Sequence, residues 1–213
     1  MSVVALGVPS VHRQASDPAS PCPTEGPLVD TFGRVATDLR VSLTDLCNLR
    51  CTYCMPAEGL DWMPGEQKLD ADELIRLLRL AVTRLGTTSV RFTGGEPLLQ
   101  LDATLIEALH ARDFEIAVET NGTLTPPAGI DWLCVSPKGD TSLAITAGDE
   151  LKLVYPQAKA MPERFENLDF AYFMLQPMDG PDTVRNTEAC IDYCRAHPRW
   201  RLSLQTHKVL GIP

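Results

Sequence analysis

Three cysteines lie within eight residues of this 213-residue chain, Cys47, Cys51 and Cys54, in the spacing C-x3-C-x2-C. They follow a short β-like run at 39–43, so we expect them on the loop that leaves a strand. Three thiolates on one loop can bind three irons of a cubane iron–sulfur cluster, because thiolates are the usual protein ligands of such clusters. With no fourth cysteine close by, one iron keeps an open position, as catalytic metal sites do.

The alternatives for this cluster are a structural zinc site and three unconnected thiols. Zinc would need a fourth Cys or His nearby, and the sequence offers none close to the motif. The total of seven cysteines is odd, and residues 1–26 lack the basic start and apolar run of a signal peptide, so we expect no disulfide framework and a cytoplasmic location. Cys190 and Cys194, four apart on a predicted helix, are expected to be small buried residues.

The charge balance is acidic, with 19 Lys and Arg against 28 Asp and Glu, a formal net charge of −9. An acidic chain is a poor general binder of nucleic acid or anionic membranes, which attract basic surfaces. It can still bind a small anionic substrate in a local basic pocket. No stretch of 18 apolar residues occurs, so we expect no transmembrane helix.

Hydrophobic periodicity predicts alternating strands and helices, an α/β fold with a mostly parallel sheet. Residues 1–30, rich in Pro, Ser, Ala and Gly, are expected to be a disordered extension, and 31–213 a single domain. Right-handed crossovers would allow an open or partial barrel. The expected strands are 39–43, 87–92, 114–118, 130–135, 150–154, 170–175 and 201–205, and the expected helices are 70–85, 101–111 and 184–196.

A second motif, TGGEP at 93–97, follows the predicted strand that ends at Phe92. Alone, it equally fits an ordinary turn, although glycines at a strand end also let backbone approach a ligand closely. Together, the two motifs resemble those of radical S-adenosylmethionine (SAM) enzymes. The resemblance implies a partial (β/α)6 barrel with its site at the carboxyl ends of the strands, as in barrel enzymes generally.

The resemblance also implies two cofactors, a [4Fe–4S] cluster on the three cysteines and SAM on the open iron. Electron transfer from the cluster would cleave the sulfonium and yield a 5′-deoxyadenosyl radical. Tyr53 would contact the adenine region of SAM, and Gly95 and Glu96 would bind the amino group of its methionine. A flavodoxin or ferredoxin is the expected reductant.

Residues from about 1 to 99 resemble actinobacterial GTP 3′,8-cyclases. Arg34 and Arg91 then correspond to residues that contact GTP, whereas Leu46 stands where that family has Arg. The remaining cysteines lack the spacing of the second cluster of these cyclases. The matching stretches are 32–34, 39–45, 47–59 and 90–99.

Residues from about 94 to 213 resemble 7-carboxy-7-deazaguanine synthases, so the character of the sequence changes near 94–100. In substrate binding, the resemblance implicates Thr93, His207 and the terminal carboxylate of Pro213. The matching stretches are 94–102, 118–123, 129–138, 150–152, 176–180, 200–208 and 210–213. The residues implied to line the SAM pocket are Ser136, Pro137, Lys138, Gln176, Pro177, Met178 and Asp179.

Some synthase features are missing from the sequence. Its N-terminal Gln-Gly-Glu substrate loop and the Arg before the first cysteine have no counterpart here. Pro56 occupies the position of a magnesium-binding threonine and offers no hydroxyl, which leaves Mg²⁺ without that ligand.

We interpret the chain as a radical SAM lyase that converts 6-carboxy-5,6,7,8-tetrahydropterin to 7-carboxy-7-deazaguanine. The alternatives are a GTP 3′,8-cyclase and a hybrid that binds the cofactors without a competent substrate site. The expected partners are a small pterin or purine substrate and a reductant, with no nucleic acid or membrane, and the synthase resemblance suggests a homodimer.

Overall fold

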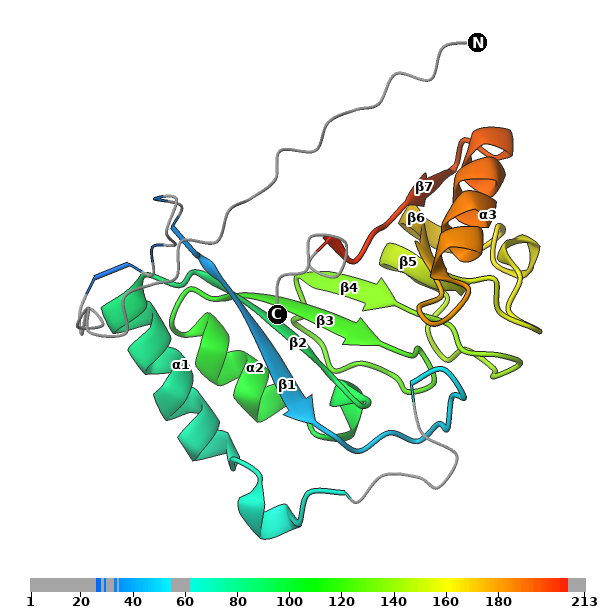
Figure 1. Cartoon of the computed structure of the whole chain (residues 1–213). Helices are drawn as coiled ribbons and strands as arrows, with labels where there is room; N and C mark the ends of the chain where they lie inside the picture. The colour runs from blue at the N-terminus through cyan, green and yellow to red at the C-terminus, as the bar shows by residue number, and fades with distance from the viewer. Residues whose placement is uncertain (1–25, 28, 30–32, 34, 55–61, 207–213) are drawn as a thin grey trace.

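The computed structural model describes residues 26, 27, 29, 33, 35–54 and 62–206. They form one sheet of seven strands in the order β1 to β7, and every neighbouring pair is parallel (Figure 1). Every predicted strand and helix is found, with ends shifted by a few residues. The strands are β1 Asp38–Thr44, β2 Ser89–Gly94, β3 Glu115–Thr120, β4 Trp132–Val135, β5 Ala147–Tyr155, β6 Asp169–Pro177 and β7 Trp200–Leu202. The α-helices are α1 Ala71–Leu85, α2 Ala103–His110 and α3 Thr183–Ala196, and the 3₁₀ turns are η1 Gly65–Gln67, η2 Pro97–Leu99 and η3 Pro162–Arg164.

The sheet is not closed, because β1 and β7 form its two edges, which is consistent with the predicted partial barrel. The α-helices lie in the connections after β1, β2 and β6. In the described part of the chain, the connections after β3, β4 and β5 contain no α-helix, unlike a full set of βα units. These connections, 121–131, 136–146 and 156–168, are close to the minimum length for a parallel crossover, which leaves little room for a helix. No helix in residues 62–206 is long and apolar enough to cross a bilayer.

Helix α1 shows how local sequence sets the element boundaries. Asp70 accepts a hydrogen bond from the Glu73 amide at 2.8 Å, and the Glu73 carboxylate accepts one from the Asp70 amide at 3.1 Å, a capping box. The helix ends at Gly86, whose φ of 72° is left-handed and favours glycine. These signals place α1, and Leu74 and Leu78 on its inner face are buried against the sheet.

The two faces of the sheet differ in chemistry. On the outer face, apolar side chains pack against the helices in two clusters, one under α1 and α2 and one under α3. Alternate residues of the same strands point to the opposite, concave face, where Arg40, Arg91, Glu119 and Lys152 lie. Barrel interiors are usually filled with branched apolar side chains, so charged residues here indicate a site.

Candidate active site

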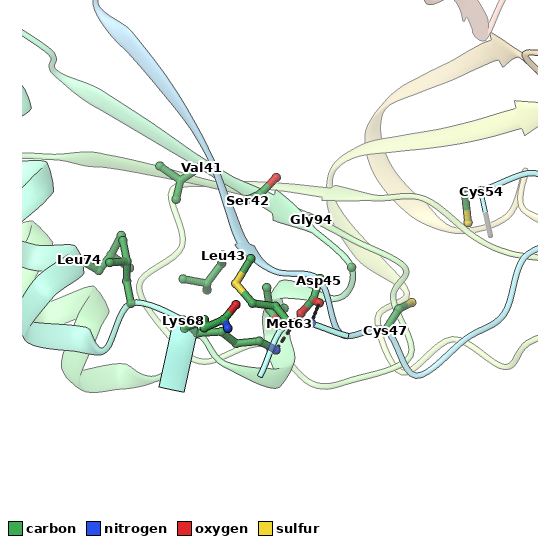
Figure 2. Close-up of a pocket in the computed structure, with 14 residues that line it drawn as sticks. Val41, Ser42, Leu43, Asp45, Cys47, Cys54, Met63, Lys68, Leu74 and Gly94 are labelled. Carbon is green, nitrogen blue, oxygen red and sulfur yellow. Dashed lines mark hydrogen bonds and ion pairs between the residues drawn. The ribbon is translucent and has the colours of Figure 1, made fainter. Parts of the chain in front are cut away.

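A cavity of about 660 Å³ lies at the carboxyl ends of the strands, and all three motif cysteines line it. Cys47 lies three residues beyond the end of β1, and Cys51 and Cys54 lie on the turn that continues from it. Figure 2 shows Cys47 and Cys54 with the end of β1 and Gly94 of the second motif. The structure thus brings the two sequence motifs together at one end of the sheet, as predicted.

The arrangement of the thiols discriminates between the metal sites considered. A single tetrahedral zinc ion needs sulfur atoms within about 4 Å of one another. Within residues 35–54 and 62–206, no three His, Cys, Asp or Glu side chains are placed to share one metal ion. A cubane cluster binds each thiolate through a different iron and does not need such a close group. The three thiols are free of disulfides and open to one cavity, so they fit a cluster better than a closed zinc site.

The polar groups of the cavity, one of them without a partner, fit a bound cofactor. The hydroxyl of Tyr53 is buried and has no hydrogen-bond partner, and burial beside the Cys51 thiol raises the pKa of Tyr53. Lys138 donates to Ser136 Oγ at 2.7 Å, and its Nζ lies 5.8 Å from the Tyr53 ring centroid. Burial lowers the pKa of Lys138. Gln176 also lines this wall, so amide, hydroxyl and ammonium groups surround the place where a polar cofactor would bind.

The paired glycines are required by contact with backbone. Gly94 has a φ of 112°, and a Cβ added to it would collide with the Thr44 carbonyl oxygen. A Cβ on Gly95 would collide with the Leu46 carbonyl oxygen. The Gly95 amide donates to Thr44 O and the Glu96 amide to Leu46 O, both at 2.7 Å. The glycines therefore let this turn lie directly against the backbone that leads into the cysteine loop.

Glu96 lies beside the cavity but does not line it. Its side chain is fully buried and accepts hydrogen bonds from Thr120 Oγ1 at 2.7 Å, the Asn121 amide at 2.7 Å and the Leu98 amide at 3.1 Å. These bonds occupy the carboxylate in joining the second motif to the end of β3. Contact of Glu96 with a cofactor stays a prediction.

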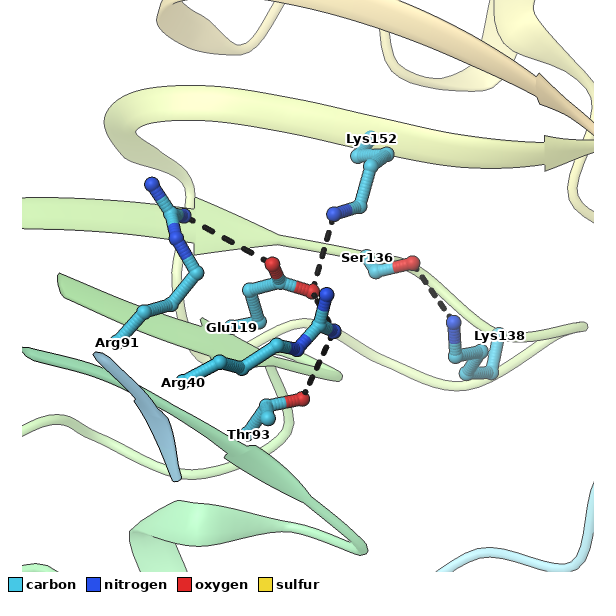
Figure 3. A network of polar contacts seen from close by, with 7 residues as sticks. All are labelled: Arg40, Arg91, Thr93, Glu119, Ser136, Lys138 and Lys152. Atoms are coloured by element: carbon cyan, nitrogen blue, oxygen red, sulfur yellow. Dashed lines mark hydrogen bonds and ion pairs between the residues drawn. The ribbon is translucent and has the colours of Figure 1, made fainter. Parts of the chain in front are cut away.

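A charged network covers the concave face beside the cysteines (Figure 3). Glu119 pairs with Lys152 at 3.0 Å, Arg40 at 3.3 Å and Arg91 at 3.7 Å. Arg40 also donates to Thr93 Oγ1 at 3.3 Å. Burial acts to raise the pKa of Glu119, but the three cations outweigh it and hold that pKa below its ordinary value. With three cations and one carboxylate, the group has a formal charge of 3 − 1 = +2, a local basic group of the kind that the acidic balance of the chain does not exclude.

Most predicted site residues meet in this cavity. Four do not line it: Glu96, Pro137, Met178 and Arg91, although Arg91 adjoins it through Glu119. Arg34, Pro56, His207 and Pro213 lie outside the described residues. The predicted residues that line the cavity are Cys47, Cys51, Tyr53, Cys54, Thr93, Gly95, Ser136, Lys138, Gln176, Pro177 and Asp179.

The sequence analysis missed Arg40, Glu119, Asn121 and Lys152 as site residues. Glu119 and Lys152 lie in the stretches that resemble synthases, and Arg40 lies in one that resembles cyclases. Neither resemblance assigned these residues a contact with substrate or cofactor. The usable signal was alternation, since residues two apart on a strand share a face. Asn121 donates to Asn48 Oδ1 at 2.8 Å and lies 3.9 Å from Cys47 Sγ, a contact between loops that no periodicity reveals.

Comparison with known proteins agrees with this geometry. The family model described as the radical SAM superfamily matches residues 41–206. A 7-carboxy-7-deazaguanine synthase of Bradyrhizobium diazoefficiens is 66% identical over 164 residues, 76% of this chain and 78% of that protein. A GTP 3′,8-cyclase of Mycobacterium sp. (strain KMS) is 68% identical over 126 residues, 57% of this chain but 35% of the cyclase.

Among solved structures, QueE from Escherichia coli shares the fold with a TM-score of 0.59 at 23% identity, covering 79% of this chain and 84% of that chain. The partial-barrel prediction is thereby confirmed. The family model covers most of the chain, so the chain belongs to the radical SAM superfamily. The synthase match spans most of both sequences, whereas the cyclase match spans about a third of the cyclase. Within the superfamily, the chain therefore belongs to the family of 7-carboxy-7-deazaguanine synthases.

Proposed function

We propose that this protein converts 6-carboxy-5,6,7,8-tetrahydropterin to 7-carboxy-7-deazaguanine, with loss of ammonia. The observation that carries the proposal is the single cavity shared by the two parts of the chain. The cysteine loop, which resembles a cyclase, and Ser136, Lys138 and Gln176, which resemble a synthase, line the same space. If each part had lost the rest of its site, as in a non-functional hybrid, the two parts would not be expected to line one continuous polar cavity.

In this proposal, Cys47, Cys51 and Cys54 hold the cluster, and Tyr53 and Lys138 belong to the SAM pocket together with Ser136, Gln176 and Asp179. When bound and reduced, these cofactors supply the 5′-deoxyadenosyl radical that abstracts hydrogen from the substrate. The chain's own task is to orient the two reactants and to exclude water. The Lys138 ammonium suits the carboxylate of SAM, and the unpaired Tyr53 hydroxyl suits a polar atom of the cofactor.

The charged network supplies the substrate subsite. Arg40, which lines the cavity, suits the carboxylate at C6 of the pterin, because a guanidinium matches carboxylate geometry with two parallel donors. Arg91 adjoins the cavity through Glu119 and adds to the positive charge there. Glu119 stays ionised at neutral pH and can accept hydrogen bonds from N–H groups of the pterin ring. Lys152, whose side chain is 17% exposed, positions Glu119. Together these groups would hold C6 toward the SAM side of the cavity.

The cyclase alternative rests on the same cations, since Arg40, Arg91 and Lys152 also suit a triphosphate. Against it, the matching segment spans 35% of the cyclase length. Cys134 and Cys190 are fully buried, which disfavours a second cluster built from the remaining cysteines. The hybrid without a competent substrate site predicts slow SAM cleavage that no substrate accelerates.

The test is an anaerobic assay of the reconstituted, reduced protein with SAM. 5′-Deoxyadenosine and the deazapurine are both quantified by mass spectrometry with the pterin, with GTP and with neither. The conversion of the pterin to the deazapurine and ammonia is redox-neutral, so the hydrogen atom that the radical removes has to be returned. We therefore expect deazapurine and ammonia in the pterin arm alone, in amounts that exceed 5′-deoxyadenosine. Formation of 5′-deoxyadenosine with GTP alone, or equal slow SAM cleavage in all three arms without deazapurine, would overturn the proposal.

Matched variants sharpen the same assay. Cys51→Ser should reduce deazapurine formation to background, whereas Cys190→Ser, at a buried cysteine that does not line the cavity, should retain it. Omission of Mg²⁺ should leave the rate nearly unchanged, because Pro56 has no hydroxyl to bind it. A flavodoxin or ferredoxin would serve as reductant, and dimerisation is left to a measurement of mass in solution.

A further inference from the structure

The carboxylate of Asp45 lies two residues before the first cysteine, at the end of β1, and contacts the chain on the far side of the cysteine loop. It accepts a hydrogen bond from the Met63 amide at 2.5 Å and pairs with Lys68 Nζ at 2.7 Å. Figure 2 shows Met63 and Lys68 directed at this one carboxylate. Met63 is 18 residues along the chain from Asp45, so the contacts close a loop that contains all three thiols.

The departing limb of this loop is attached to the sheet by other bonds. The carbonyl of Leu46 accepts from the Glu96 amide at 2.7 Å. Asn48 accepts from Asn121 Nδ2 and donates to Thr123 Oγ1, both at 2.8 Å. These bonds fix the chain on the β2 and β3 side. Asp45 instead holds the returning limb, which leads into η1 and α1, so it performs a separate task.

The surroundings strengthen the Asp45–Lys68 pair. A second cavity, of about 590 Å³, has apolar walls that include Leu43, Leu69 and Leu74. The Lys68 side chain is 13% exposed and that of Asp45 31%. An ion pair shielded in this way is screened less by salt than a surface pair.

Closing a long flexible loop costs conformational entropy. If the loop is closed before its ligand binds, binding does not include that entropic cost. If the ends of the cysteine loop are joined beforehand, the thiolates are held closer to the arrangement that the cluster requires. We propose that Asp45 is a positioning residue that closes the cysteine loop through Met63 and Lys68 and thereby slows loss of the iron–sulfur cluster. This inference rests on the cluster assignment of the proposed function and not on the identity of the substrate.

The test compares three variants with the wild-type protein. Asp45→Ala removes both contacts, and Lys68→Gln removes one of them. The control is Asp140→Asn, because Asp140 pairs with Lys159 at 2.9 Å but both side chains are about 70% exposed. The control reproduces the loss of an Asp–Lys pair without touching the cysteine loop.

The first readout is the rate at which the holoprotein loses its cluster to an iron chelator, followed anaerobically by visible absorbance without SAM or substrate. Residues that hydrogen-bond to metal ligands typically contribute 10- to 100-fold to metal affinity, and Asp45 acts one step further out, on the loop that carries the ligands. We therefore expect loss to be about 10-fold faster in Asp45→Ala, less accelerated in Lys68→Gln and unchanged in Asp140→Asn. Wild-type rates in both loop variants would overturn the proposal.

The second readout uses the apoprotein, so it is independent of cluster binding. Hydrogen exchange of the Met63 amide should be about 10-fold faster in Asp45→Ala, because that amide loses its acceptor. Wild-type exchange at Met63 would overturn the closed loop even if no cluster could be loaded. If Asp45→Ala does not fold, cluster loss from Lys68→Gln decides alone, and a wild-type rate in that variant counts against the proposal. Neither readout depends on turnover. The proposed function can therefore fail in the turnover assay without changing the outcome of this test.

Discussion

The half of the sheet that carries the cysteines and the half that carries the proposed SAM pocket are held together in different ways. Around β1 to β3, polar groups join loops to one another: Asp45 to Lys68, Asn48 to Asn121 and Glu96 to Thr120. Around β5 to β7, aromatic side chains fill the core, and Phe173 meets Trp200 edge to face with centroids 5.2 Å apart. The first half positions a loop by directed bonds, whereas the second positions strand ends by packing.

The largest expected effect lies in the packed half. Phe173→Ala should lower the free energy of unfolding by about 3–5 kcal/mol, because it removes a fully buried ring and leaves a cavity. Val184→Ala, at a side chain 75% exposed on α3, should change it by less than about 0.5 kcal/mol. Urea unfolding measures both. Similar losses for the two variants would contradict the packed core.

A smaller effect is expected in the half held by polar bonds. Glu96→Gln keeps the shape but turns one buried acceptor into a donor that faces other donors. The expected loss is about 1–3 kcal/mol of unfolding free energy, with faster exchange of the Asn121 amide. Glu107→Gln, at an exposed position on α2, is the control. If Asn121 exchange did not change, Glu96 would not be what holds the end of β3.

The smallest effect concerns pH. Because the pKa of Glu119 is lowered in the folded state, its stabilisation is present above the unfolded value of about 4.3 and is lost as pH falls through the folded pKa. Glu119→Gln should cost roughly 1 kcal/mol at pH 7. Its stability should then fall less than that of the wild type as the solution is acidified below pH of about 4.3.

The control for Glu119 is Glu115→Gln, at the exposed start of the same strand. Its pH profile should follow the wild type. Parallel profiles for Glu119→Gln and wild type would show that the three cations do not act on this carboxylate.

The sequence could predict what depends on neighbours in the chain. The capping box at Asp70 and Glu73 and the glycine at Gly86 bound α1, and both functional motifs lie at strand ends as expected. It could not predict the Glu119 network, because Arg40, Arg91 and Lys152 meet that carboxylate only through the register of the five strands β1 to β5.

The hydrogen bonds of Glu96 could not be predicted from the sequence either. A motif glutamate suggests a ligand, but its three donors come from η2 and from the end of β3, more than 20 residues away. The absence of α-helices after β3, β4 and β5 in the described chain likewise follows from short connections rather than from any residue type. Tertiary contacts and lengths decided both outcomes.

The turn at Gly94 and Gly95 bears on how a chain with two resemblances can hold together. Its interlock with the cysteine loop is formed by main-chain atoms, amides 95 and 96 on carbonyls 44 and 46. These contacts depend on the backbone conformation of residues 44–46 and not on their side chains. A junction at this turn therefore tolerates a change of sequence character on either side, provided that both glycines stay. Recombination between two radical SAM proteins at this turn would keep these contacts, because peptide groups alone form them.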